Sequence, residues 1–215
     1  MRSSDAYARG GGCPCVNNAM ANLSSARPLF DAAQVCDAEE LSRLVSLGIP
    51  VDSADEDGYT ALHRVCRGGQ QDVARAVTVL IDGGANVNLA TKQGTTALHI
   101  MCFRSHGDKA DKRTGKAIGF LTDIGADPSV RDNNSAVAMH YAAAAGLDTH
   151  CMHMYVAGAK PDIYDMYGRK PLDWAKEAGK TKTAMLLFVM EYGHTLQVRA
   201  REGRGVGMQM HTVWG

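Results

Sequence analysis

The sequence has little that marks a membrane, secreted or polyanion-binding protein. No run of about 18 apolar residues occurs, and the first thirty residues have no apolar core of a secretory signal. Lys and Arg number 23 and Asp and Glu number 23, so the formal net charge is zero. No overall field therefore attracts nucleic acid or an anionic membrane. We expect a soluble, cytoplasmic protein with no membrane partner, and a nuclear or assembly-bound location stays open.

The motifs of catalysis and the cysteine pattern of a small disulfide-bonded protein are missing as well. Six cysteines are spread over 215 residues, two of them in a Cys13-Pro14-Cys15 pair. We interpret them as reduced thiols, although the pair is also compatible with metal binding, lipidation or redox chemistry. No phosphate-binding glycine loop, nucleophile elbow, kinase motif set or zinc-protease helix occurs. We therefore expect no enzyme activity, no catalytic residues, no cofactor and no small-molecule substrate.

What the sequence does contain is an internal repeat. Residues 57–63 read DGYTALH and residues 93–99 read QGTTALH, with weaker copies at 135–140 (SAVAMH) and 168–173 (GRKPLD). A second marker keeps the same spacing, because Gly48, Gly84, Gly125 and Gly158 follow one another at intervals of 36, 41 and 33 residues. His63, His99, His140 and Asp173 follow at the same three intervals. Two markers with identical spacing indicate a structural repeat.

These residues closely resemble the ankyrin repeat, a unit of about 33 residues with a β-turn and two antiparallel helices. The resemblance covers roughly residues 30–193. It implies an all-α fold, an ankyrin-repeat solenoid of antiparallel helix pairs joined by β-turn fingers. Helix pairs are expected at about 57–92, 93–133, 134–166 and 167–193, after a half-repeat near 30–56. The resemblance also implies that His63, His99 and His140 fix the finger turns and hold neither substrate nor metal.

Local patterns agree with this interpretation. Apolar residues recur at helical spacing, as in Met185, Leu186, Val189 and Met190, and each marker glycine is placed as a left-handed C-cap. We expect a polar outer face on both end repeats, with Gly193 ending the last helix pair. The predicted organisation is a flexible N-terminal tail at 1–28, an ankyrin repeat domain at 29–193 and a C-terminal arm at 194–215.

Three further features receive structural interpretations. His150-Cys151-Met152-His153 is the sharpest local suggestion of a metal site, but no further ligand pair accompanies it, so we predict no metal. Cys66 and Cys102 occupy equivalent positions in adjacent repeats and are predicted to be two separate buried thiols. The longer interval of 41 residues places a charged loop at about 104–116, between the two helices of the second repeat.

In this family the fingers and first helices line a concave face that binds proteins. We therefore predict a non-catalytic protein–protein interaction module, an adaptor or regulator, with protein partners of unknown identity. The predicted partner-binding residues are Tyr59, Arg67, Phe103, Arg104, Arg131, Asn133, Tyr164, Met166, Tyr167 and Arg169. Phe103 and the last four should form one exposed apolar patch; alternatively, Phe103 joins the core and the tyrosines shield the turns.

A second functional hypothesis concerns the tails, each of which carries a net charge of +2. As Arg/Gly-rich arms they would hold the protein as an architectural subunit of a large protein or ribonucleoprotein assembly. Nucleic acid is expected to be a partner only through these tails, within such an assembly.

Overall fold

The described part of the chain is an all-α stack of helix pairs. A computed structural model describes residues 26–68, 73–104 and 108–201, and the side chains in these ranges except at 104–114 and 196–201. A helix over residues 26–35 precedes α2 (Ala38–Ser46). The later pairs are α3 (Ala61–Gly68) with α4 (Val73–Asp82), α5 (Ala97–Arg104) with α6 (Asp108–Asp123), α7 (Ala138–Ala145) with α8 (Asp148–Val156), and α9 (Pro171–Glu177) with α10 (Thr181–Arg201).

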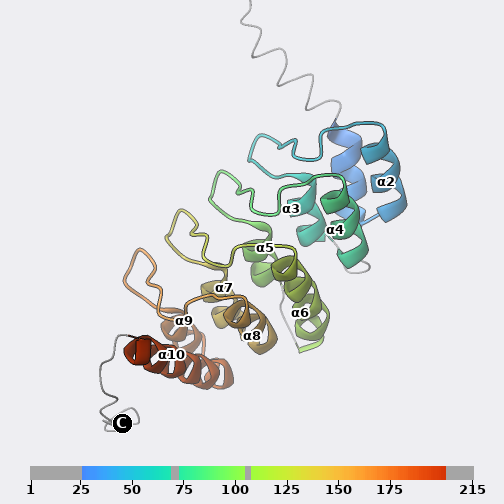
Figure 1. Cartoon of the computed structure of the whole chain (residues 1–215). Helices are drawn as coiled ribbons and strands as arrows, with labels where there is room; N and C mark the ends of the chain where they lie inside the picture. The colour runs from blue at the N-terminus through green and yellow to red at the C-terminus, as the bar shows by residue number, and fades with distance from the viewer. Residues whose placement is uncertain (1–25, 69–72, 105–107, 202–215) are drawn as a thin grey trace, which may run out of the picture.

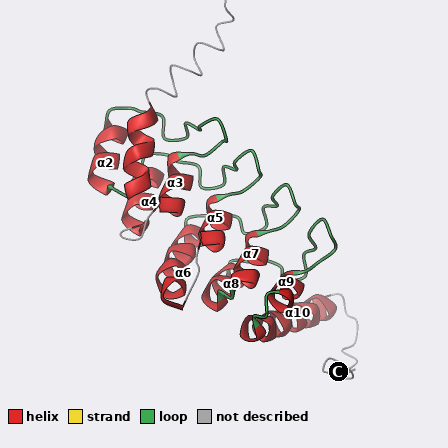
Figure 2. Ribbon diagram, turned by 180° about the vertical axis from the view of Figure 1, so that it is seen from behind, coloured by secondary structure: helices red, strands yellow, loops and turns green. Residues whose placement is uncertain are grey.

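The pairs follow one another in a single row, and the loops between them project from the same side as a row of fingers (Figures 1 and 2). The first helices pack in the order α3, α5, α7 and α9, and the second helices in the order α2, α4, α6, α8 and α10. Each short helix therefore buries its apolar face against its neighbours in the row. The predicted solenoid of antiparallel helix pairs is confirmed.

The marker glycines end the second helices of successive pairs. Gly48, Gly84, Gly125 and Gly158 all have positive φ, between 78° and 96°. In this left-handed conformation, favoured by glycine, the backbone turns back and satisfies helix carbonyls. The N–H of Gly48, for example, donates to the carbonyl of Val45 at 2.9 Å. The C-caps predicted from the sequence are confirmed.

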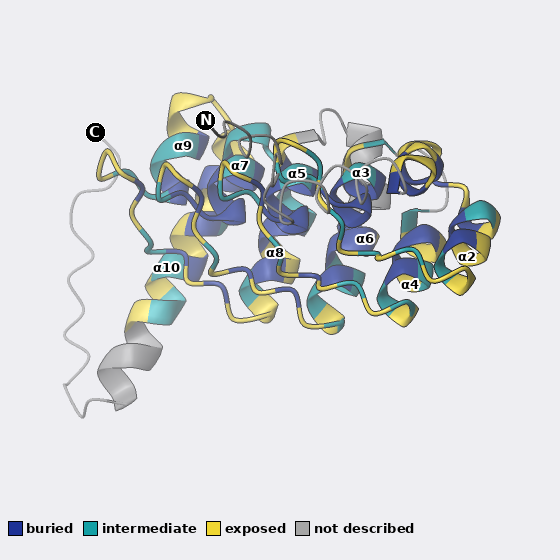
Figure 3. Ribbon diagram, turned by 90° about the horizontal axis from the view of Figure 1, so that it is seen from above, coloured by how far each residue is buried: buried dark blue, intermediate teal, exposed yellow. Residues whose placement is uncertain are grey.

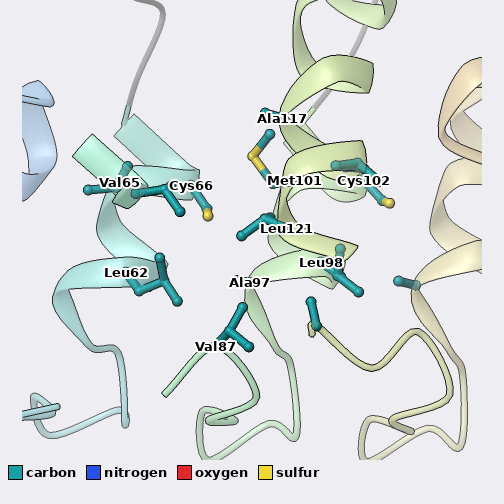
Figure 4. Close-up of a cluster of buried hydrophobic side chains, with 14 of the residues drawn as sticks. Leu62, Val65, Cys66, Val87, Ala97, Leu98, Met101, Cys102, Ala117 and Leu121 are labelled. Atoms are coloured by element: carbon teal, nitrogen blue, oxygen red, sulfur yellow. The ribbon is translucent and has the colours of Figure 1, made fainter. Parts of the chain in front are cut away.

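One elongated core runs through the row (Figure 3). In Figure 4, Leu62 and Cys66 of α3 point toward the next pair, where Met101 of α5 and Leu121 of α6 lie on the near side. Cys66 and Cys102 are buried thiols and form no disulfide, as predicted, and Cys102 points away from α3 (Figure 4). Burial raises the pKa of the Cys102 thiol well above its usual value.

Two expectations about the N-terminal half are corrected. The segment predicted as a half-repeat at 30–56 contains two helices, residues 26–35 and α2, and the first reaches into the predicted tail. The charged segment predicted as a loop at 104–116 is helical from Asp108 onward, so α6 is 16 residues long. Lys, Ala and Arg favour helix, and acidic residues suit the first turn, which explains why the inserted residues lengthen a helix.

The C-terminal end also differs from the sequence-based prediction. Helix α10 continues through Gly193 to Arg201, beyond both the expected helix end and the domain boundary at 193/194. Its buried side chains include Ala184, Leu187 and Met190, whereas Met185 and Val189 are exposed. The predicted apolar stripe therefore has the wrong register, and the outer face of the last repeat is not polar. Both results follow from an α10 that is apolar on more than one side.

Candidate protein-binding face

Backbone hydrogen bonds join the fingers side by side. The N–H of Lys92 donates to the carbonyl of Asp57, and the N–H of Asn133 donates to that of Gln93, both at 3.0 Å. The N–H of Met166 continues the series with the carbonyl of Asn134 at 2.9 Å. Because each finger is bonded to the next, the side chains at the tips are presented at a fixed spacing.

The repeated histidines fix the start of each first helix, as the resemblance implies. Nδ1 of His63, His99 and His140 accepts the backbone N–H three residues earlier, at 3.1 to 3.2 Å. Nε2 of His99 and His140 lies 3.3 and 3.2 Å from the carbonyl oxygens of Ala136 and Arg169 in the following repeat. These bonds assign the proton to Nε2. Burial lowers the pKa of all three imidazoles, which keeps them neutral.

In the last repeat Asp173 replaces this histidine. Its Oδ2 accepts the N–H of Lys170 at 2.8 Å, so the bond at the helix start is kept. A carboxylate has no donor for a following finger, which fits its place at the end of the row.

An aspartate stabilises three of the four fingers and ties each one to its helix. Oδ1 of Asp55, Asp132 and Asp165 accepts the N–H groups two and four residues later, at 2.8 to 3.0 Å. Oδ2 accepts from the residue that follows the signature His or Asp: Arg64 at 2.6 Å, the Tyr141 hydroxyl, and the Trp174 indole at 2.9 Å. The position after the signature residue therefore faces the fingers.

The Asp165 network is the densest of these. Besides Trp174, its Oδ2 accepts from Nε and a terminal nitrogen of Arg169, at 3.0 and 2.9 Å. Burial of Asp165 opposes ionisation, but the hydrogen bonds from Arg169, Trp174 and Tyr167 outweigh it and lower the pKa to about 2. The Arg169 guanidinium also lies over the rings of Tyr167 and Trp174.

In the third repeat, Tyr141 is the residue bonded to the finger aspartate, Asp132. Burial and this hydrogen bond raise the pKa of the Tyr141 hydroxyl to about 12.

The second repeat, which consists of α5, α6 and the finger that precedes α5, lacks this hydrogen bond between an aspartate of the finger and the first helix. Thr91 stands at the aspartate position and Ile100 at the position that follows the signature histidine. Thr91 Oγ1 accepts one finger N–H, from Thr95 at 3.3 Å. Over this repeat lies a groove of about 780 Å³. Its lining residues are Tyr59, Arg67, Gln93, Thr95, His99, Ile100, Phe103, Asp132, Asn133, Asn134 and Tyr141.

Four of the predicted partner-binding residues meet in this groove: Tyr59, Arg67, Phe103 and Asn133. Phe103 is 68% exposed, so it does not belong to the core. The Arg67 guanidinium lies 5.6 Å above the Tyr59 ring. Arg104 ends α5, and its side chain lies outside the described residues. Among the described side chains, the groove therefore combines apolar surface with the Arg67 guanidinium, the Asp132 carboxylate and several side-chain amides.

The other predicted residues belong to the last two fingers. Tyr164, Met166 and Tyr167 are more than half exposed, at 52%, 56% and 71%. Arg131 instead bonds the carbonyls of Ser135 and Tyr164, at 3.2 and 2.9 Å, and so joins the two fingers. Arg131, like Arg169, stabilises the fingers directly.

Sequence reasoning missed the residues that connect these two groups. Tyr141 contacts Phe103 edge-on at 6.3 Å and Trp174 at 5.3 Å, and the Arg169 guanidinium lies over the rings of both Trp174 and Tyr167. Phe103, Tyr141 and Trp174 thus form an aromatic row, and Arg169 links its Trp174 end to Tyr167. Tyr141 and Trp174 follow directly after a signature residue, as do Arg64 and Ile100. The position directly after the signature His or Asp is therefore the sequence feature from which Tyr141 and Trp174 could have been identified.

The suggestion of a metal at 150–153 finds no geometric basis within the described ranges. No three His, Cys, Asp or Glu side chains there converge on a point where they could hold an ion. His150 is buried, and Nδ1 of His153 lies 2.7 Å from the carbonyl of Thr149. In the same part of the chain, no helix is both long and apolar enough to span a membrane.

Comparisons with known proteins agree with this geometry. The family model of ankyrin repeats, in three copies, matches residues 29–112. The inactive serine/threonine-protein kinase TEX14 of Bos taurus is 32% identical over 76 residues, which is 35% of this chain and 5% of that protein. The chain thus spans about one twentieth of this curated relative's length. Ankyrin repeats are generally non-catalytic protein–protein interaction modules. Residues 29–112 thus match ankyrin repeats, and the described residues form one all-α solenoid of helix pairs that continues this repeat to α10.

Proposed function

We propose that the protein is an adaptor or regulator that binds an extended segment of a partner protein along the concave face. The single observation that carries this proposal is the groove over the second repeat, in which Phe103 and Ile100 present apolar surface to solvent between polar groups. Aromatic and arginine side chains around an apolar centre are typical of residues that anchor protein interfaces. The groove volume of about 780 Å³ accommodates several side chains.

The surroundings of the groove specify the chemistry of the partner segment. An apolar side chain would pack on Ile100 and Phe103, while the amides of Gln93 and Asn134 would bond its backbone. Arg67 favours an acidic residue at one side of the groove. The exposed carboxylates of Glu56 and Asp57 on the first finger favour a basic residue beyond it. A segment with an apolar anchor between an acidic and a basic residue therefore fits this face.

The proposal is tested with Phe103→Ala in the full chain. We expect binding of a co-purifying partner to weaken by about 30-fold or more, because removing a central aromatic anchor typically costs about 2 kcal/mol. Thermal stability should change little, since Phe103 is largely exposed. Affinity is measured by calorimetry with the recovered partner, and Val156→Ala, on the distant end of α8, is the matched control.

The aromatic fingers provide a second, independent variant. Replacing Tyr164, Met166 and Tyr167 together by Ala should abolish binding if the partner follows the aromatic row to the last fingers. Unchanged affinity in both the triple variant and Phe103→Ala would rule out the concave face as the binding surface.

A further inference from the structure

Helix α10 has an uncovered apolar face. Met185, Phe188, Val189 and Tyr192 are spaced as i, i+3, i+4 and i+7, so they lie on one side of the helix. Their exposed fractions are 56%, 42%, 67% and 42%. The other apolar side of α10, which contains Leu187 and Met190, packs on α8 and α9. A helix that is apolar on two sides is normally covered on both.

The uncovered face is part of a groove of about 450 Å³ between α9 and α10. Leu172 and Lys176 of α9 form one wall, and Met185, Phe188 and Val189 of α10 form the other. Figure 1 shows α9 and α10 as the last helix pair of the described row. In Figure 3, the ribbon of α10 extends away from the buried interior of the row and carries exposed segments. The groove therefore offers binding surface independent of the concave face.

The chain itself supplies a segment suited to this groove. Residues 205–215 read GVGMQMHTVWG and contain no Asp, Glu, Lys or Arg. Solvated tails are usually rich in charge and poor in aromatic residues. This segment instead carries Val206, Met208, Met210, Val213 and Trp214. Methionine adapts to irregular apolar surfaces and tryptophan buries the largest area, so these residue types suit a shallow apolar groove.

Chain length allows the contact. Val189 and Met185 precede the end of α10 at Arg201 by 12 and 16 residues, which is about 18 and 24 Å of helix. An extended chain covers about 3.3 Å per residue, so seven residues to Met208 span about 23 Å and thirteen to Trp214 about 43 Å. Gly203, Gly205 and Gly207 follow α10 in the sequence, and glycine permits the sharp reversal that such a contact would require. Tethering by so short a linker gives an effective concentration in the millimolar range.

We propose that residues 206–214 fold back along α10 and cover the α9–α10 groove, with Trp214 packed between Leu172 and Val189. The segment acts as an internal cap of the ankyrin stack. It replaces the polar outer face that a terminal repeat normally has.

The full chain labelled with 5-fluorotryptophan provides the test, because it contains only two tryptophans, Trp174 and Trp214. Trp214→Phe assigns the two fluorine resonances. A soluble paramagnetic chelate should broaden the Trp214 resonance only weakly in the wild-type chain. Val189→Asp places a charge in the groove and should increase this broadening several-fold. Trp174, bonded to Asp165, should remain unchanged and thereby shows that the stack is folded.

Val156→Asp is the matched control, since Val156 is also an exposed valine on a second helix, at 80% exposure, but lies on α8 outside the groove. It should leave the Trp214 resonance as in the wild type. Strong broadening of Trp214 in the wild-type chain, or equal broadening with and without Val189→Asp, would overturn the proposal. Protection that appears only at high protein concentration would assign the groove to a second copy of the chain and overturn it as well.

Discussion

The second and third repeats have the same turn geometry but present different surfaces. In both, the signature imidazole accepts the N–H at the helix start, from Thr96 in one and Val137 in the other. The third repeat adds Asp132, which ties its finger to Tyr141, whereas the second has Thr91 and Ile100 at these positions. The histidine bonds therefore specify the fold, and the Asp/Tyr or Thr/Ile pair specifies the surface.

This difference explains where the groove lies. In the first, third and last repeats, the finger aspartate is bonded to the side chain that follows the signature residue, and this pair occupies the space between the finger and the first helix. In the second repeat, Ile100 takes the partner's position without a bond to the finger and leaves apolar surface beside Phe103. The second repeat thus has a weaker tie between finger and helix and a more favourable binding surface.

The largest expected effect is at the junction of these two repeats. A Cβ at Gly94, which has φ 77°, would lie 2.9 Å from the Cα of Asp132. Gly94→Ala should lower the free energy of unfolding by about 4 kcal/mol, because left-handed strain of about 1–2 kcal/mol adds to backbone overlap that costs about 2–3 kcal/mol. Chemical denaturation measures the change.

Gly168→Ala is the control, since Gly168 has φ 75° in the equivalent turn and a Cβ there meets nothing within 4 Å. It should cost only the left-handed strain, about 1 kcal/mol after the gain from a stiffer unfolded chain. Equal losses in the two variants would show that the fingers are not in close contact.

A second, smaller effect concerns the two finger acceptors. Asp132→Ala should destabilise the protein by about 3 kcal/mol, because two finger N–H groups and the Tyr141 hydroxyl lose their acceptor. Thr91→Ala removes a methyl group and a hydroxyl that bonds Thr95 Oγ1 at 2.7 Å, Gln93 Oε1 at 3.2 Å and the Thr95 N–H at 3.3 Å. It should cost about 2 kcal/mol, because the bonds lost are between neutral groups within the finger itself. If denaturation gives the same loss for both, the distinction between the two repeats fails.

The smallest expected effect is a stabilisation. Ser135 has φ 57° at the turn position that Gly94 occupies in the second repeat, and its N–H donates to Asp132 in the same way. Ser135→Gly should raise the free energy of unfolding by about 0.5–1 kcal/mol, because relief of strain exceeds the entropy gained by the unfolded chain. A lower melting temperature for this variant would indicate that the Ser135 side chain contributes a contact that outweighs the strain.

Much of the fold was predictable because the repeat encodes it locally. The glycine C-caps, the histidine positions and the order of the helix pairs follow from short-range geometry. The site was predictable only in part. Phe103, Arg67 and Tyr59 were found from residue type and position, whereas Tyr141 and Trp174 were missed because an aromatic residue beside a signature residue is equally compatible with the core.

The sequence by itself determined that this chain is a stack of repeated helix pairs with fingers on one side, because spacing and turn chemistry act within one repeat. Only the tertiary structure decided that residues 108–116 extend α6, that α10 exposes Met185 and Val189, and that a groove opens over the second repeat. These features depend on which neighbour covers each helix side. That is settled between repeats, where an apolar residue is buried or exposed according to what packs against it.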